Sequence, residues 1–242
     1  MSRATRAAEF CENAGKEYIA GLRLGIVTDT QDITGNTLST CHDPIRVGDI
    51  SSVIPRFLGY QKQMPPMYSA IKIGGKKLYE LARRGVEVPR AEREIFISDI
   101  ELQGGAGRDF ILRIACSKGT YIRTLCHDIG AALGCGGIMS SLRRIRAGSF
   151  TIDSARPLDE IITAISGGNP ESVTAPVDSI FSGYPAITLD DAETRKCKNG
   201  ARCRVGGSPD GTYRFYGPDG AFLLFGEVRT GAIITIKSFF EV

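Results

Sequence analysis

The first clear pattern along the chain is an alternation of apolar and polar positions over residues 16–27. Its apolar members share one parity, namely Tyr18, Ala20, Leu22, Leu24 and Ile26. A period of two predicts a β-strand with one buried face. A short helix is expected over 4–13, before a glycine at position 15, and a polar turn over 28–35 follows the strand.

Further along, the apolar spacing around Ile50–Leu58 is helical, with Gly48 or Asp49 at its start. Pro55 lies inside this helix and predicts a kink or an early end. The remaining strands are expected over 94–102, 109–116 and 145–152, and the remaining helices from about Thr120 to Gly134 and over 158–165.

The segment Gly167–Pro170 is the best candidate for a domain boundary, because it combines two glycines with a proline. Short strands and glycine-rich turns follow from Ile187 onward and suit a small barrel-like domain. We therefore expect an α+β protein. Residues 1–166 would form a mixed, mostly antiparallel sheet with helices, residues 167–184 a connector, and residues 185–242 a β-rich domain.

Composition excludes several classes of protein. No apolar run approaches the ~20 residues of a membrane span, and the first residues lack the apolar core of a secretory signal. Seven cysteines without a C-x-x-C pair and only two histidines supply a zinc site poorly. Reduced, partly buried thiols in a cytoplasmic protein are the expectation.

Charge is unevenly distributed along the chain. Residues 61–93 hold eight Lys or Arg against three Glu, whereas residues 151–193 hold eight acids and one base. Clustered positive charge beside glycine-rich turns is typical of a protein that binds a polyanion. A solvated charged face explains the same residues, and charge alone does not separate the two interpretations.

The segment from Ser117 to Leu125 carries the most suggestive chemistry. A strand ends, Gly119 turns the chain, and a helix begins with Thr120 as the expected N-cap. Tyr121 could stack on a flipped base, and Arg123 could hold a carboxylate through two hydrogen bonds. An ordinary capped helix start with an exposed arginine is the alternative.

Four segments, in order, resemble the TruB type of tRNA pseudouridine synthase, which isomerises uridine to pseudouridine at position 55 in the T-loop of tRNA. They are KEYIAGLRLG with TDTQDITG, QMPPMYSAIKIGGKKLYELARRGVEVPRAER, CSKGTYIRTLCHDIGAALG and SSLRRIRAGSF. The resemblance runs from about residue 3 to the end of the chain. It implies a monomer that binds the T-stem-loop without metal or cofactor, and a C-terminal RNA-binding domain of PUA type over 185–242.

The resemblance also implies roles for single residues. Tyr18 would stack on the target base, Tyr121 would contact the substrate, Arg123 would pair with the catalytic aspartate, and Leu142 would line the base pocket. The insertion over 63–93 would grip the RNA stem through its basic residues, Lys72, Lys76, Lys77, Arg83 and Arg84.

The nucleophilic aspartate of that family lies in a G-H-T-G-x-L-D-P-like segment, for which this sequence offers no match. We therefore expect a catalytic domain that lacks its N-terminal part, a marginally stable chain, and an Arg123 without its carboxylate. Asp43 and Asp190 have superficially similar neighbours but are expected to be accidental matches. Asp29 and Asp32 are expected to form a turn or to position RNA.

Two hypotheses follow. The chain is a pseudouridine synthase whose sequence here is short of its N-terminus, or it is a relative that holds the T-loop without modifying it. Tritium release from labelled tRNA distinguishes them.

Overall fold

The computed structural model describes residues 3–240, and the chain folds into two compact units. One unit comprises residues 13–155, and the other comprises residues 1–12 together with 156–242. Each unit has its own hydrophobic core. The boundary that the sequence predicts at 167 stays a prediction.

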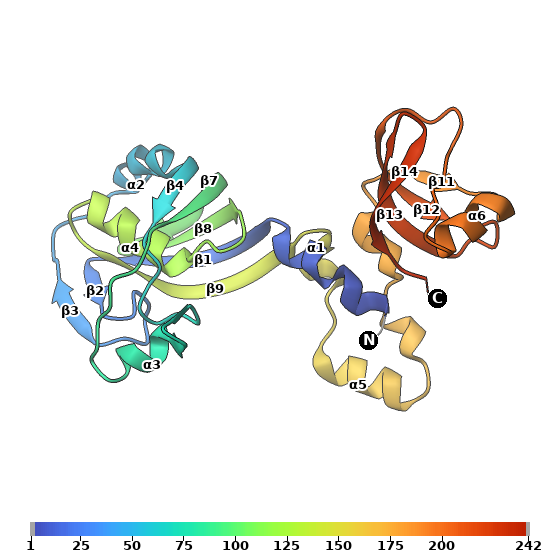
Figure 1. The fold of residues 1–242 in the computed structure, drawn as a ribbon. Helices are drawn as coiled ribbons and strands as arrows, with labels where there is room; N and C mark the ends of the chain where they lie inside the picture. The colour runs from blue at the N-terminus through green and yellow to red at the C-terminus, as the bar shows by residue number, and fades with distance from the viewer. Residues whose placement is uncertain (1–2, 241–242) are drawn as a thin grey trace. The chain divides into compact units, whose positions relative to one another are not determined.

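The unit of residues 13–155 is built on a six-stranded antiparallel sheet in the order β10-β9-β1-β8-β7-β4 (Figure 1). Its strands are β1 Lys16–Leu24, β4 Gly59–Gln63, β7 Arg93–Ala106, β8 Asp109–Cys116, β9 Gly137–Ala147 and β10 Phe150–Thr151. The predicted alternation is confirmed in β1, where Ala20, Leu22 and Leu24 are buried. The strand ends there because Gly25 takes a φ of 83°.

Beyond Gly25 the chain forms a separate ribbon of β2 Ile26–Thr28 and β3 Thr37–Thr40. The polar turn expected over 28–35 connects these two strands. Strand β9 begins at Gly137, well before the predicted start at 145. Its sequence, GIMSSLRRIRA, shows no clean alternation, and its pairing with β1 contains two register shifts.

Two helices pack on the buried side of this sheet. Helix α2 spans Val47–Val53 and passes at Pro55 into a 3₁₀ turn, Ile54–Phe57, as the predicted kink requires. It begins at Val47 because the Asp49 carboxylate accepts a hydrogen bond from the Arg46 backbone N–H, at 2.8 Å.

Helix α4 spans Ile122–Ala132, so it begins two residues later than expected. The Thr120 hydroxyl donates to the Ser117 carbonyl at 3.0 Å and does not cap the helix. The apolar face of α4 is buried as predicted: Ile122, Leu125 and Ile129 join the core.

The insertion over 63–93 forms a small hairpin and one helical turn. Strands β5 Lys72–Ile73 and β6 Lys76–Lys77 pair with each other, and α3 spans Leu78–Ala82. Gly85, at a φ of 71°, ends this helical segment as predicted.

The second unit contains a four-stranded sheet in the order β11-β12-β13-β14, in which only the β11–β12 pair is parallel. Its strands are β11 Ala186–Thr188, β12 Gly211–Tyr216, β13 Phe222–Arg229 and β14 Ala232–Ser238. Its helices are α1 Ala8–Asn13, preceded by a 3₁₀ turn over Arg3–Ala7, α5 Leu158–Ser166 and α6 Asp191–Lys198. Helix α6 was not predicted, because its sequence DAETRKCK has no apolar periodicity. The predicted α+β class, with a small C-terminal β-rich part, is confirmed.

Within residues 3–240, every helix is too short or too polar to cross a membrane.

Among the glycines of the larger unit, Gly130 has the closest backbone neighbour, where α4 meets the start of β9. A Cβ added at Gly130 would come within 2.1 Å of the Gly137 backbone nitrogen, so only glycine fits there. We predict that Gly130→Ala lowers the free energy of unfolding by about 2 kcal/mol or more, measured by urea denaturation. Gly48→Ala, in α2 with open space around it, is the control and should be neutral or stabilising. Equal effects of the two substitutions would contradict this packing.

Candidate active site

The centre of the candidate site is an ion pair between Arg123 and Asp32. Arg123 lies in the first turn of α4, and its Nη1 is 3.0 Å from Oδ2 of Asp32 in the turn between β2 and β3. The Arg123 Nη2 donates to the Tyr68 carbonyl. Both charged side chains are mostly buried, with 23% and 14% of their areas exposed. Arg123 thus has a carboxylate partner in this chain, Asp32. That it lacks the carboxylate of a nucleophilic aspartate stays a prediction.

Asp32 is held by its own turn as well as by Arg123. Its Oδ1 accepts hydrogen bonds from the Thr34 hydroxyl at 2.6 Å, the Thr30 hydroxyl at 2.8 Å and the Thr34 backbone N–H at 3.0 Å. Burial alone would raise the pKa of Asp32, but these bonds and Arg123 favour the carboxylate more and bring its pKa below the usual 3.8. Asp32 is therefore an ionised, fully engaged partner for Arg123.

The turn that carries Asp32 is fixed to its neighbours. Gln31 has a φ of 63°, in the left-handed region that non-glycine residues rarely occupy. Its side chain accepts a hydrogen bond from Thr124 of α4 at 2.8 Å, and its carbonyl accepts one from the backbone of Met139 at 3.1 Å. Helix α4 and strand β9 together hold the strained turn in place.

The beginning of the insertion is attached to the same end of α4. The Gln63 amide is buried, donates to the Tyr121 carbonyl at 3.1 Å, and accepts from the Tyr121 N–H at 2.8 Å. Together with the bond from Arg123 to Tyr68, this pair links the insertion to the two residues that sequence analysis singled out. A conformational change in the insertion would thus reach Arg123 directly.

Tyr18 and Leu142 come from adjacent strands of the sheet. Tyr18, in β1, packs against the hydrophobic core. Leu142, in β9, is paired with Ala20, which lies two residues after Tyr18 on the same face of the sheet. Leu142 is 44% exposed, although it is a large apolar residue. An exposed leucine beside a half-buried tyrosine is suited to contact a planar, partly apolar ligand. Among the contacts of the described residues, Arg123 binds Asp32 and Tyr68 and neither Tyr18 nor Leu142.

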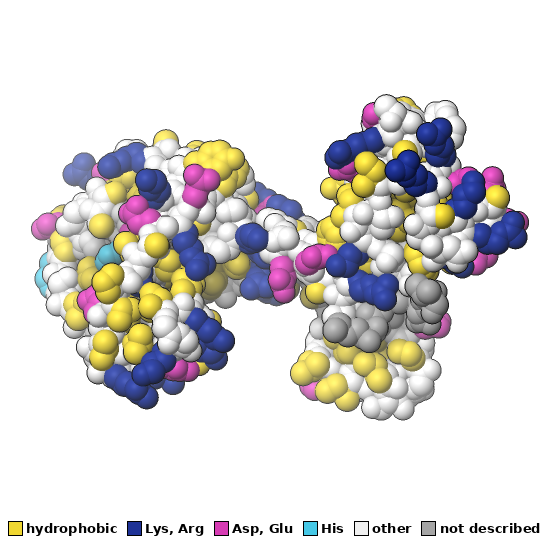
Figure 2. Space-filling model, viewed as in Figure 1, with side chains coloured by type: hydrophobic (Ala, Val, Ile, Leu, Met, Phe, Trp, Pro, Cys, Tyr) yellow, Lys and Arg dark blue, Asp and Glu magenta, His cyan; other side chains and the backbone are white. Residues whose placement is uncertain are grey.

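The basic residues of the insertion lie at its surface. Lys72, Lys76, Arg83 and Arg84 are exposed, whereas Lys77 is half-buried and donates to the Tyr79 hydroxyl at 3.2 Å. Figure 2 shows blue side chains gathered around the part of the larger unit where α3 lies. This arrangement presents positive charge without acidic neighbours in ion-pair contact, among the residues the structure describes.

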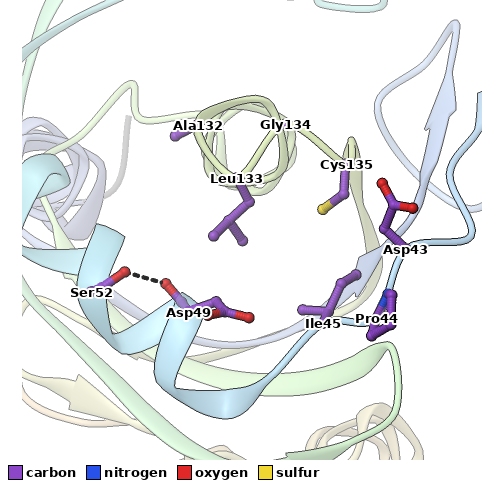
Figure 3. Close-up of a pocket in the computed structure, with 9 residues that line it drawn as sticks. All are labelled: Asp43, Pro44, Ile45, Asp49, Ser52, Ala132, Leu133, Gly134 and Cys135. Carbon is purple, nitrogen blue, oxygen red and sulfur yellow. Dashed lines mark hydrogen bonds between the residues drawn. The ribbon is translucent and has the colours of Figure 1, made fainter.

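The other aspartates considered from sequence lie elsewhere. Asp43 lines a hollow of about 320 Å³ next to Leu133 and Cys135, beyond the C-terminal end of α4 (Figure 3). That end is roughly 15 Å from the first turn, which carries Arg123. Asp190 caps α6 in the other unit, and Asp29 accepts two hydrogen bonds from Asn36.

Over residues 3–240, no group of three or more His, Cys, Asp or Glu side chains is arranged to hold a metal ion. All seven cysteines are free thiols, five of them buried. Burial raises the pKa of the Cys126 thiol to about 12, so it has no nucleophilic thiolate near neutral pH.

Three participants in this site were not predicted from the sequence. Asp32 was expected to form a turn or position RNA, and its spacing gave no sign that it meets Arg123, 91 residues away. Gln63 stands at the edge of the insertion without a local motif of its own. The Tyr68 carbonyl is a backbone group and leaves no signal in a sequence.

Two family models match consecutive parts of the chain. The model described as TruB family pseudouridylate synthase (N terminal domain) matches residues 1–122. The model described as tRNA pseudouridylate synthase B C-terminal domain matches residues 123–182.

Curated relatives match nearly the whole chain. The tRNA pseudouridine synthase B of Syntrophomonas wolfei is 43% identical over 93% of this chain and 76% of its own length. That of Azoarcus sp. is 39% identical over 96% of this chain and 77% of its own length. The chain thus spans about three quarters of these relatives.

A solved structure of a Cbf5-Nop10-Gar1 complex contains a chain with the same fold. It superposes with a TM-score of 0.70 at 24% identity, over 99% of this chain and 71% of that one. At this level of identity the comparison establishes the fold alone.

The low pKa of Asp32 gives a prediction about stability and pH. In the unfolded state the Asp32 carboxyl has its usual pKa of 3.8, whereas in the folded state its pKa is lower. As the pH falls, the unfolded state therefore takes up a proton first, and the free energy of unfolding decreases below about pH 4. We predict that Asp32→Asn lowers the free energy of unfolding at pH 7 by about 1–3 kcal/mol. Its stability should also fall less steeply between pH 5 and pH 3 than that of the unsubstituted chain, measured by denaturant titration at each pH.

Asp29→Asn is the matched control, because it removes an acid from the same turn without touching Arg123. It should keep the steep decline of the unsubstituted chain below about pH 4. An Asp32→Asn variant with an unchanged pH profile would show that the ion pair does not contribute to folding.

Proposed function

Because the chain belongs to the TruB family of tRNA pseudouridine synthases, which are isomerases, we propose that its substrate is the uridine at position 55 in the T-loop of tRNA. The observation that carries this proposal is the position of Arg123. It lies in the first turn of α4 and is held there by Asp32 and by the Tyr68 carbonyl. An arginine fixed in this way is ready to orient a carboxylate beside a flipped base.

In this proposal the sheet supplies the wall of a uridine pocket. Tyr18 stacks on the base, Leu142 covers its edge, and Tyr121 contacts the nucleotide from the start of α4. The support is that Tyr18 and Leu142 lie on one face of β1 and β9, while Tyr121 is oriented through its backbone by Gln63.

The insertion would grip the stem of the T-arm. Its exposed Lys72, Lys76, Arg83 and Arg84 can meet phosphates, and the glycine-rich hairpin between β5 and β6 allows close approach of the backbone. Residues 185–242 would add a second RNA contact as a PUA-like domain. Arg195, Lys198 and Arg202, exposed on α6 and in the loop after it, are the candidates.

One observation favours a second function, binding of the T-loop without turnover. Oδ1 of Asp32 accepts three hydrogen bonds, and Oδ2 pairs with Arg123. A nucleophile needs an oxygen directed at the base. These contacts favour a role for Asp32 in holding Arg123, and we leave the nucleophilic step unassigned.

Affinity for a T-arm RNA hairpin, measured over a range of salt concentrations, tests recognition. We predict a dissociation constant in the nanomolar to micromolar range. In a Lys76→Gln/Arg84→Gln variant, the slope of the logarithm of the binding constant against the logarithm of the salt concentration should become shallower by about one to two. An Arg46→Gln/Arg56→Gln variant is the control, because it removes two exposed positive charges from the α2 region. Equal losses in both variants, or no binding, would contradict recognition through the insertion.

Tritium release from the same hairpin, labelled at C5 of its uridines, separates the two functions. Tritium release by the 242-residue chain would support turnover, and binding of this RNA without release would support the second function. Release that persists in Asp32→Asn would exclude Asp32 as the nucleophile, because an amide cannot replace a carboxylate in that step.

A further inference from the structure

Arg144, in strand β9, contacts the face of the Tyr18 ring. The centre of its guanidinium group lies 5.7 Å from the ring centroid, within the range of a cation–π interaction. The two residues are directly paired in register across β1 and β9, immediately after a register shift between Glu17 and Tyr18. The pairing therefore brings a cation to the tyrosine that is proposed to stack on the target base.

This arginine has no competing partner that would explain its position. It is exposed, and within residues 3–240 no carboxylate forms an ion pair with it. The nearby Arg146 differs, because it is bound to Glu17 at 2.6 Å. A guanidinium group with free N–H donors beside an aromatic platform is the arrangement that recognises a stacked base together with its phosphate.

The neighbouring Arg143 provides a built-in comparison. It is exposed too, but successive residues of a strand point to opposite faces of the sheet, and Arg143 is paired with Ile19 rather than with Tyr18. Arg143 carries the same charge next to Arg144 in the chain, but it lies on the face of the sheet away from the proposed pocket. A comparison of Arg143 and Arg144 variants therefore separates the effect of charge alone from the effect of position on the pocket face.

We propose that Arg144 is a positioning residue for the RNA: it fixes the ring of Tyr18 and binds the phosphate next to the base that stacks there. This rests on the proposed function, because it assumes that a nucleotide enters beside Tyr18. It adds a specific phosphate contact within the pocket itself, separate from the grip of the insertion on the stem. The base and its own backbone would then be held from one side by two paired residues.

The test measures T-arm hairpin affinity and its salt dependence for the full chain and for single variants. Arg144→Met should weaken binding about tenfold and reduce the salt slope by about one. Arg143→Met should weaken binding about twofold at most, as expected for a general charge effect. Arg144→Lys keeps the charge but loses the flat guanidinium group, so its affinity should lie between those of the Arg144→Met and Arg143→Met variants.

Coupling to Tyr18 is tested in the same assay. In a Tyr18→Leu background, Arg144→Met should weaken hairpin binding by no more than about threefold, because the ring that positions the arginine is gone. Equal affinities of the Arg144→Met and Arg143→Met variants would overturn this inference while leaving T-arm recognition intact. An unsubstituted chain that does not bind the hairpin would overturn the proposed function and this inference with it.

Discussion

The arrangement of the candidate site depends on one constraint, the burial of a guanidinium group at the first turn of α4. Arg123 is mostly removed from water, so its charge must be compensated where it lies. Asp32 supplies the opposite charge, and the Tyr68 carbonyl accepts a second N–H. These partners come from two separate segments, and the arginine therefore fixes the β2–β3 turn and the insertion to the same helix end.

The surrounding structure is consistent with this constraint. The turn that carries Asp32 is strained at Gln31, and hydrogen bonds from Thr124 and Met139 hold it. On the other side, Gln63 binds the backbone of Tyr121 one residue before α4 begins. Because these contacts meet within one turn of helix, a displacement of the insertion would also move Tyr121 and Arg123. The insertion and the ion pair are thus linked through a few short contacts.

Sequence patterns predicted much of the fold, because burial follows periodicity where an element has one buried face. The alternation in β1 and the apolar face of α4 were both recognised, and both are in the core. Patterns failed where pairing or capping decides the structure. Strand β9 is irregular and is held by its register with β1, and the polar helix α6 depends on its cap at Asp190.

The candidate site was partly predictable for a related reason. Tyr18, Tyr121, Arg123 and Leu142 stand in recognisable segments, so their proposed roles could be stated before the structure. The partner of Arg123 could not, since an ion pair over 91 positions leaves no local pattern. Backbone acceptors such as the Tyr68 carbonyl are equally invisible, because every residue carries one.

The most direct measurement is a double-mutant cycle on this ion pair, with Asp32→Asn, Arg123→Gln and the double variant compared for stability and for T-arm binding. We expect the double variant to be about as impaired as the worse single variant, with a coupling energy of about 1–3 kcal/mol. If the two single losses instead add to the double-variant loss within about 0.5 kcal/mol, Asp32 and Arg123 act independently and do not form the pair on which the site depends.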